Sequence, residues 1–123
     1  MAHSYNELEI YQLSIEFQQN IFVRSKHWPK EELYALTDQI RRSSRSIGAC
    51  IAEAWGKRRY PAHFLSKLTD ADSENLETQH WITTAKHCGY LTLDETSQYL
   101  ATSSRIGRQL GTMMAKHESF CIN

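Results

Sequence analysis

Apolar side chains recur every three to four residues over four stretches of the chain, which is the spacing of an amphipathic α-helix. The stretches cover residues 7–26, 30–58, 61–88 and 93–117, and none shows the alternation that a half-buried β-strand has. Connections of two to four residues join them, and long helices joined in this way pack antiparallel to their neighbours. The sequence therefore predicts a single all-α domain over residues 1–123, an antiparallel up-down-up-down four-helix bundle.

Capping and proline signals predict where these helices begin and end. Asn6 is a favourable N-cap for the first helix, and Pro29 disfavours helical backbone at the residue before it. Pro61 suits the first position of the third helix. Thr92 followed by Glu95 is a capping box, so the fourth helix is expected to begin directly after Thr92.

The second helix has an apolar face that predicts its core contacts. Residues 37–38 offer another helix start, so residues 30–36 either belong to the long helix or form a separate short turn. Gly48 lies in the middle of the helix, where glycine costs about 1 kcal/mol against alanine, and we expect close packing there. The predicted core stripe consists of Leu33, Leu36, Ile40, Ile47, Ile51 and Ala54.

The opposite face of this helix has small side chains between two charged ones. We call Arg42, Ser46, Ala49, Glu53 and Gly56 the small-residue stripe. Small side chains allow another helix to approach closely, and the Arg and the Glu can pair with that helix. The stripe predicts a second packing surface, within the bundle or between subunits, whereas the alternative is a solvated face that happens to be small. For assembly we select Arg42, Ser46, Ala49 and Glu53.

The run from Gln39 to Arg58 resembles the hallmark of the 23S rRNA intervening-sequence protein family. It matches the family pattern at Gln39, Arg42, Ser46, Ile47, Ile51, Ala52, Glu53 and Trp55. It departs from the pattern at Cys50, where the family usually has Asn, and at Ala54, where it usually has Gly. The resemblance implies a four-helix protein similar in fold to the accessory variability determinant protein of diversity-generating retroelements, which is a homopentamer. It implies no defined reaction.

The composition indicates a globular protein, and we expect it in the cytoplasm. Of the 123 residues, 41% are hydrophobic and 23% are charged, as in chains that build a core. No run approaches the roughly 20 apolar residues of a membrane span, and the first residues lack the basic and apolar regions of an export signal. Cys50, Cys88 and Cys121 have no metal-ligand spacing. We expect reduced thiols, with the first two packed as small apolar residues.

The net charge is zero, but charge is distributed unevenly along the chain. The second helix is basic and the first half of the third is acidic, so these helices either neutralise each other or leave an exposed basic patch. Nucleic-acid binding requires such a patch, and Trp55 and Tyr60 are candidate stacking surfaces. The candidate nucleic-acid-binding residues are Arg41, Arg45, Lys57, Arg58 and Arg59.

The sequence contains no complete arrangement for catalysis. Glu77 and His80 form one Glu-x-x-His element, whereas a di-iron bundle needs two, so we expect no metal and no other cofactor. Cys50 and the serines near it have no assignable base, and there is no phosphate-binding glycine loop. We therefore expect a non-enzymatic homo-oligomer, a pentamer as the resemblance implies, that acts as a scaffold or protein-interaction module. The alternative is an accessory protein that binds RNA or DNA.

Overall fold

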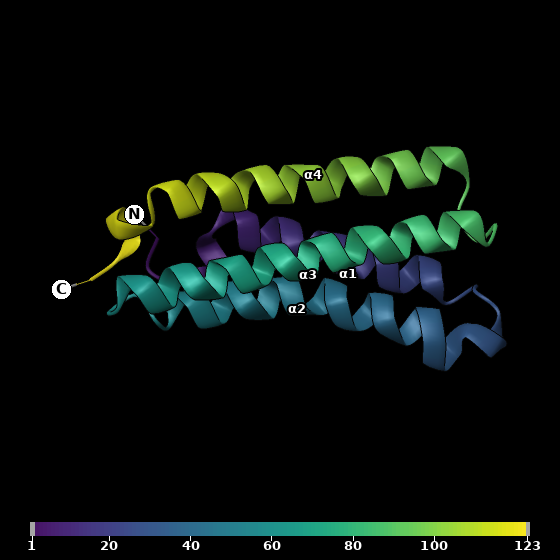
Figure 1. Cartoon of the computed structure of the whole chain (residues 1–123), viewed down its shortest axis with the longest axis horizontal. Coiled ribbons are helices and arrows are strands. Elements are labelled where there is room, and N and C mark those ends of the chain that lie inside the picture. Colours follow the sequence, from purple (N-terminus) through teal and green to yellow (C-terminus); the bar gives the residue numbers. More distant parts are fainter. Residues whose placement is uncertain (1, 123) are drawn as a thin grey trace.

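Four long helices form the protein in a computed structural model that describes residues 2–122. They are α1 (Glu9–Ser25), α2 (Asp38–Trp55), α3 (Pro61–His87) and α4 (Leu93–Ala115), and the described residues form no β-strand. Consecutive helices run in opposite directions, and both ends of the chain lie at the same end of the bundle (Figure 1). The predicted all-α, up-down-up-down four-helix bundle is confirmed.

The first helix begins later than the sequence predicts. Asn6 lies inside a 3₁₀ turn, η1 (Tyr5–Glu7), and does not cap α1. The backbone of Leu8 is extended (φ −71°, ψ 131°) and interrupts helical geometry between this turn and Glu9. The predicted Asn6 N-cap is therefore wrong, because an N-cap must lie directly before the first helical residue.

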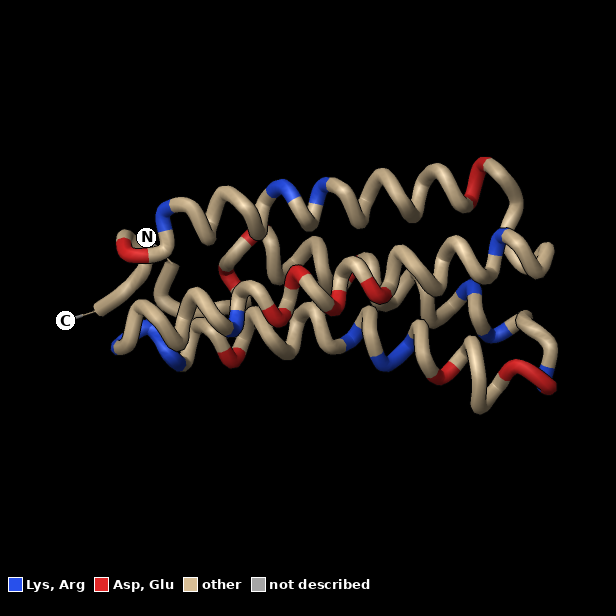
Figure 2. Tube along the Cα trace, in the orientation of Figure 1, with Lys and Arg blue, Asp and Glu red and all other residues tan. Residues whose placement is uncertain are grey.

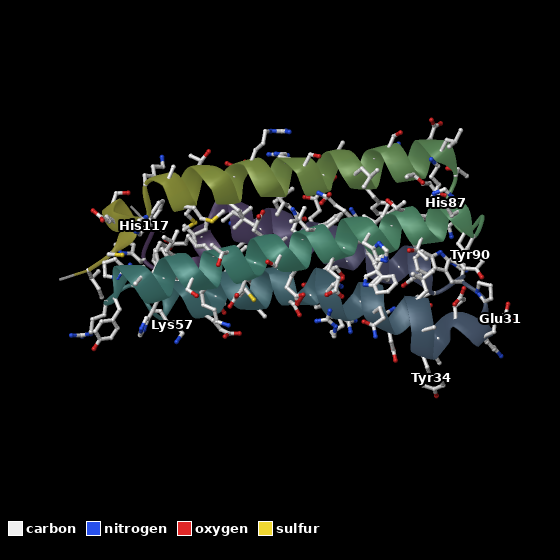
Figure 3. All side chains as sticks on the ribbon, viewed as in Figure 1. Glu31, Tyr34, Lys57, His87, Tyr90 and His117 are labelled. Atoms are coloured by element: carbon white, nitrogen blue, oxygen red, sulfur yellow. The ribbon has the colours of Figure 1, made fainter. Side chains whose placement is uncertain are left out.

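The segment before α2 is a separate irregular turn. It consists of a 3₁₀ turn, η2 (Lys30–Glu32), and a π-helical turn, η3 (Leu33–Thr37). Leu33 is 39% exposed, so its predicted place in the core is wrong and the core stripe begins at Leu36. The wider π turn breaks the 3.6-residue period on which the prediction rested. Tyr34, in the same turn, points away from the bundle (Figure 3).

The ends of α3 and α4 agree with their sequence signals. Pro61 is the first residue of α3, and Gly89 follows its last turn with a φ of +81°, a backbone conformation that favours glycine. At the start of α4, the Glu95 backbone N–H donates to Thr92 Oγ1 (3.1 Å) and the Thr92 N–H donates to Glu95 Oε1 (2.9 Å). The predicted capping box is confirmed.

The core lies along the axis of the bundle, where all four helices contribute side chains. In α1, the stripe of Ile10, Leu13, Phe17 and Ile21 is buried. A second apolar stripe of α1 is only half-buried and lies at the edge of the bundle, and it consists of Leu8, Tyr11, Ile15 and Phe22. Cys50 is buried as predicted, but Cys88 is exposed because it follows the last turn of α3. The predicted packing of Cys88 is wrong.

Two buried polar clusters connect α3 to its neighbours. Asn75 Nδ2 donates to the Ser103 carbonyl oxygen (3.0 Å), and Ser103 Oγ donates to Asn75 Oδ1 (2.8 Å). Thr78 Oγ1 donates to Ser43 Oγ (2.8 Å). Arg42 and Glu53 of α2 lie at the surface and are not the partners of Asn75 or Thr78. Short serine side chains of α2 and α4 are therefore the partners of these two α3 residues.

We expect a Glu95→Gln variant to lose about 1 kcal/mol of stability at pH 6 and nothing near pH 2. Hydrogen bonds from Arg24 and from the Thr92 backbone lower the pKa of Glu95 from 4.5 to about 2. A carboxyl with a lowered pKa stabilises the fold above its unfolded pKa, and this contribution is lost as the pH falls from 4.5 towards 2. Urea denaturation of the wild type and of Glu95→Gln across this pH range measures the difference in stability. A difference that does not change with pH would contradict the ion-pair account.

Candidate functional site

The charged ends of the small-residue stripe pair with α3 of the same chain. Arg42 forms ion pairs with Glu74 (3.0 Å) and with Glu77. At the other end, Glu53 lies 2.9 Å from Lys67 Nζ. These charges therefore connect α2 to α3 within one subunit, which is the first of the two placements that the sequence left open.

The middle of the stripe remains accessible. Ala49 is exposed and Ser46 is partly exposed, and Ser46 Oγ donates to the Arg42 carbonyl oxygen of its own helix (2.8 Å). Gly56 is also exposed, at the C-terminal end of α2. Small accessible side chains between two ion pairs leave room for another backbone to approach α2.

The candidate nucleic-acid-binding residues separate into two groups. Figure 2 shows basic residues in the N-terminal half of α2, beside acidic residues of α3, and a second basic group at the C-terminal end of α2. Arg45 and Lys57 are 12 positions apart in the sequence, which corresponds to roughly 18 Å along a helix. Lys57 lies at the end of the bundle opposite Tyr34 (Figure 3). A ligand that contacts both groups must therefore be extended.

The first group surrounds one aromatic ring between α1 and α2. The cationic centres of Lys26, Arg41 and Arg45 lie 4.7, 4.9 and 5.2 Å from the centre of the Phe22 ring. We call these three residues the cation cluster. Arg41 Nε also donates to Ser25 Oγ (2.9 Å). Lys26 was not among the predicted residues, although its position four residues after Phe22 places both on one face of α1.

The second group lies around the end of α2. The Arg58 guanidinium lies 3.6 Å from the centre of the Trp55 ring, and Arg58 Nε donates to the Trp55 carbonyl oxygen (2.9 Å). Lys57 and Arg59 are exposed. Arg58 covers one face of Trp55, whereas Tyr60 is 57% exposed and leaves more of its ring open for stacking.

The acidic residues of α3 neutralise only part of the positive charge of α2. Only Arg42 among the arginines of α2 lies within 4.0 Å of a carboxylate in the described residues. Asp38 and Arg42 line the same surface hollow as Arg41 and Arg45, but Asp38 forms no ion pair with these arginines. Neutralisation therefore applies to the side of α2 that faces α3, and the side that faces α1 keeps its positive charge.

The chain is similar to known proteins in both sequence and fold. The sequence model of the 23S rRNA-intervening sequence proteins matches residues 6–112. The chain belongs to this family. A solved structure from Bacteroides thetaiotaomicron, a protein of unknown function from the S23 ribosomal protein family, is similar with a TM-score of 0.78 and 27% identity. The similarity covers 87% of this chain and 96% of that chain. No curated protein matches the chain.

The side chains that the sequence offers for chemistry have structural roles in the bundle. Glu77 accepts hydrogen bonds from Trp81 and Arg42, which lower its pKa, and the His80 ring packs edge-on against Trp81. Burial raises the pKa of the Cys50 thiol and so opposes formation of a reactive thiolate. Within residues 2–122, no group of three His, Cys, Asp or Glu is placed to hold a metal, and no helix is long and apolar enough to cross a membrane.

An open groove between the start of α1 and the end of α4 was not predicted. It has a volume of about 530 Å³ and a mainly apolar surface. Arg105 at its edge pairs with Glu9 of α1 (2.9 Å). Its other lining residues include Leu8, Ile10, Arg108, Met113, Lys116 and Phe120. Sequence patterns could not reveal it because its two walls are about 100 residues apart in the chain.

Proposed function

We propose that this 23S rRNA-intervening sequence protein is a non-enzymatic, homo-oligomeric scaffold, with five subunits as the expected number. The accessible Ser46 and Ala49 between two fixed ion pairs support a helix-packing surface between subunits. The subunit number rests on the resemblance to the pentameric accessory variability determinant protein. The hydrogen bonds of Glu77 and the burial of the Cys50 thiol support a role without catalysis.

An Ala49→Arg variant is expected to dissociate the oligomer while leaving the helices intact. Ala49 is exposed in the subunit, so the new side chain has room there, but at a close helix contact it overfills the interface. We expect each contact to weaken about tenfold or more, measured as native mass by light scattering alongside circular dichroism. The control is Ala101→Arg, at an exposed position of α4. A monomeric wild type, or an unchanged mass in Ala49→Arg, would contradict the proposal.

Nucleic-acid binding is a second candidate function, favoured by the cation cluster. Lys26, Arg41 and Arg45 lie close together without a carboxylate partner in the described residues, and phosphate groups are the counterions that such sites bind in nucleic-acid-binding proteins. The expected result is binding of an RNA or DNA oligonucleotide whose affinity falls steeply with added salt. Affinity that does not depend on salt, or no binding at low salt, would exclude this function.

A further inference from the structure

The cation cluster is compact and lacks a neutralising partner. Each of its three charge centres lies within 5.2 Å of the Phe22 ring centre, so no two of them are more than about 10 Å apart. Like charges at such distances repel, and no carboxylate of residues 2–122 lies within 4.0 Å of any of them. Asp38, which lines a surface hollow together with Arg41 and Arg45, is the nearest acidic residue along α2. An anion bound here would relieve the repulsion.

The cluster is also partly ordered before any ligand binds. Attraction of each cation to the Phe22 ring holds the three side chains near one another. The hydrogen bond from Arg41 Nε to buried Ser25 fixes that guanidinium and leaves its terminal N–H groups available. Arginine presents its donors in a planar fork that suits the oxygens of a phosphate. Because the side chains lose little freedom on binding, an anion is bound more tightly than by freely moving surface cations.

The stripes of α1 and α2 that lead away from the cluster contain no acidic residue. The facing stripe of α1 consists of Tyr11, Ile15, Gln18, Phe22 and Lys26, and that of α2 consists of Arg41, Arg45, Gly48, Ala52 and Trp55. We call these ten residues the α1–α2 seam. The helices approach closely at Gly48, where a Cβ atom would lie 3.0 Å from Ser14 Oγ and 3.6 Å from the Tyr11 ring. Neither stripe includes an Asp or a Glu.

Aromatic and cationic side chains lie at the far end of the seam. Trp55 lies there with the Arg58 guanidinium against its ring, and Tyr60 is exposed just beyond the helix. The separation of roughly 18 Å between the two basic groups is a span that a few nucleotides of an extended single strand can cover. Aromatic rings bind unpaired bases, whereas a duplex keeps its bases stacked inside.

We propose that the α1–α2 seam binds a single-stranded nucleic acid, with backbone phosphates held by the cation cluster and bases near Trp55 and Tyr60. This inference rests on the nucleic-acid binding proposed above and assigns it to one surface. It adds Lys26 to the binding residues and gives Phe22 the role of a positioning residue. Arg42 lines the hollow beside Arg41 and Arg45, but it is excluded from the site because Glu74 and Glu77 already neutralise it.

The test compares two charge-reversal variants of the full chain. Fluorescence anisotropy measures binding of labelled single-stranded RNA and DNA of about 12 nucleotides at about 50 and about 200 mM salt. Lys26→Glu with Arg45→Glu is expected to weaken binding at least tenfold and to reduce the salt slope by about 1.4, the loss of two phosphate contacts. The matched control is Lys86→Glu with Arg108→Glu, which changes the same charges at exposed positions outside the seam, and we expect its affinity to stay within threefold of wild type.

The outcomes separate failure of the site from failure of the function. If the wild type binds in a salt-sensitive manner but both double variants lose affinity equally, the seam assignment is overturned and nucleic-acid binding stands. If the wild type does not bind at low salt, nucleic-acid binding itself fails. A duplex of the same sequence that competes as well as the single strand would overturn the single-stranded specificity. Equal competition by polyglutamate would show a general polyanion site instead.

Discussion

An Asn75→Asp variant is expected to lose about 4–7 kcal/mol of folding free energy at pH 7 and little near pH 3. Asn75 is 1% exposed, and both polar atoms of its amide bond Ser103 of α4. The amide nitrogen donates to the Ser103 carbonyl oxygen, a contact that an ionised carboxylate cannot make because it has no donor. A protonated carboxyl has a donor and can replace it.

The pH dependence of this variant has a defined sign. Burial raises the folded-state pKa of the introduced carboxyl above its unfolded value of about 3.9. Below that pH the group is neutral in both states and the charge penalty is absent. The penalty grows as the pH rises from about 3.9 to the raised folded pKa, and it is constant above that value.

Urea denaturation of Asn75→Asp and the wild type at matched pH values between 3 and 7 measures the difference. Ser73→Asp is the control, since Ser73 is exposed on the same helix and surface substitutions change stability by less than about 0.5 kcal/mol. A loss of stability in Asn75→Asp that does not vary with pH would show that the carboxyl escapes to solvent. It would contradict the buried contact between Asn75 and Ser103.

A Gly48→Leu variant is expected to lose about 3 kcal/mol of stability, because its side chain has no space between α1 and α2. Even a Cβ atom at this position would lie 3.0 Å from Ser14 Oγ, and Ser14 is buried and already donates to the Tyr11 carbonyl oxygen (2.7 Å). Leucine adds three further carbon atoms, so α1 must move away from α2. Thermal and urea unfolding measure the loss.

The chain offers a matched control for this substitution at Gly111. Gly111 lies in α4, and a Cβ atom there would meet nothing within 4 Å. Gly111→Leu removes the same helix-propensity cost without a clash, so we expect it to gain up to about 1 kcal/mol. Equal stability changes in the two variants would show that α1 and α2 do not approach closely at Gly48.

Much of the fold could be predicted because its signals are local. The four helices follow from an apolar period of three to four residues, and the start of α4 follows from the hydrogen bonds that Thr92 and Glu95 exchange across one helical turn. The mid-helix glycine correctly indicated a close contact at Gly48. Local prediction failed at Asn6 and Leu33, where a 3₁₀ turn and a π turn change the backbone period.

The candidate site was predicted only in part. The basic residues of α2 could be identified from the sequence. The sequence does not show which face of α2 a neighbouring helix neutralises. The separation of Arg42, which pairs with α3, from Arg41 and Arg45, which lie against Phe22 of α1, required both neighbours to be in place. Lys26 was missed for a similar reason, since only the fold brings Arg41 and Arg45 to the Phe22 ring that Lys26 contacts.

The sequence by itself determined the number of helices, their order, most of their boundaries, the main core stripe and the family. These properties depend on side chains within one or two helical turns, and the short connections then leave an antiparallel bundle. Only the tertiary structure decided that Ser103 and Ser43 satisfy Asn75 and Thr78, and that one side of α2 keeps its charge. Such contacts join residues 28 to 35 positions apart. The relative rotation of the packed helices determines which side chains meet, and no local sequence pattern encodes this rotation.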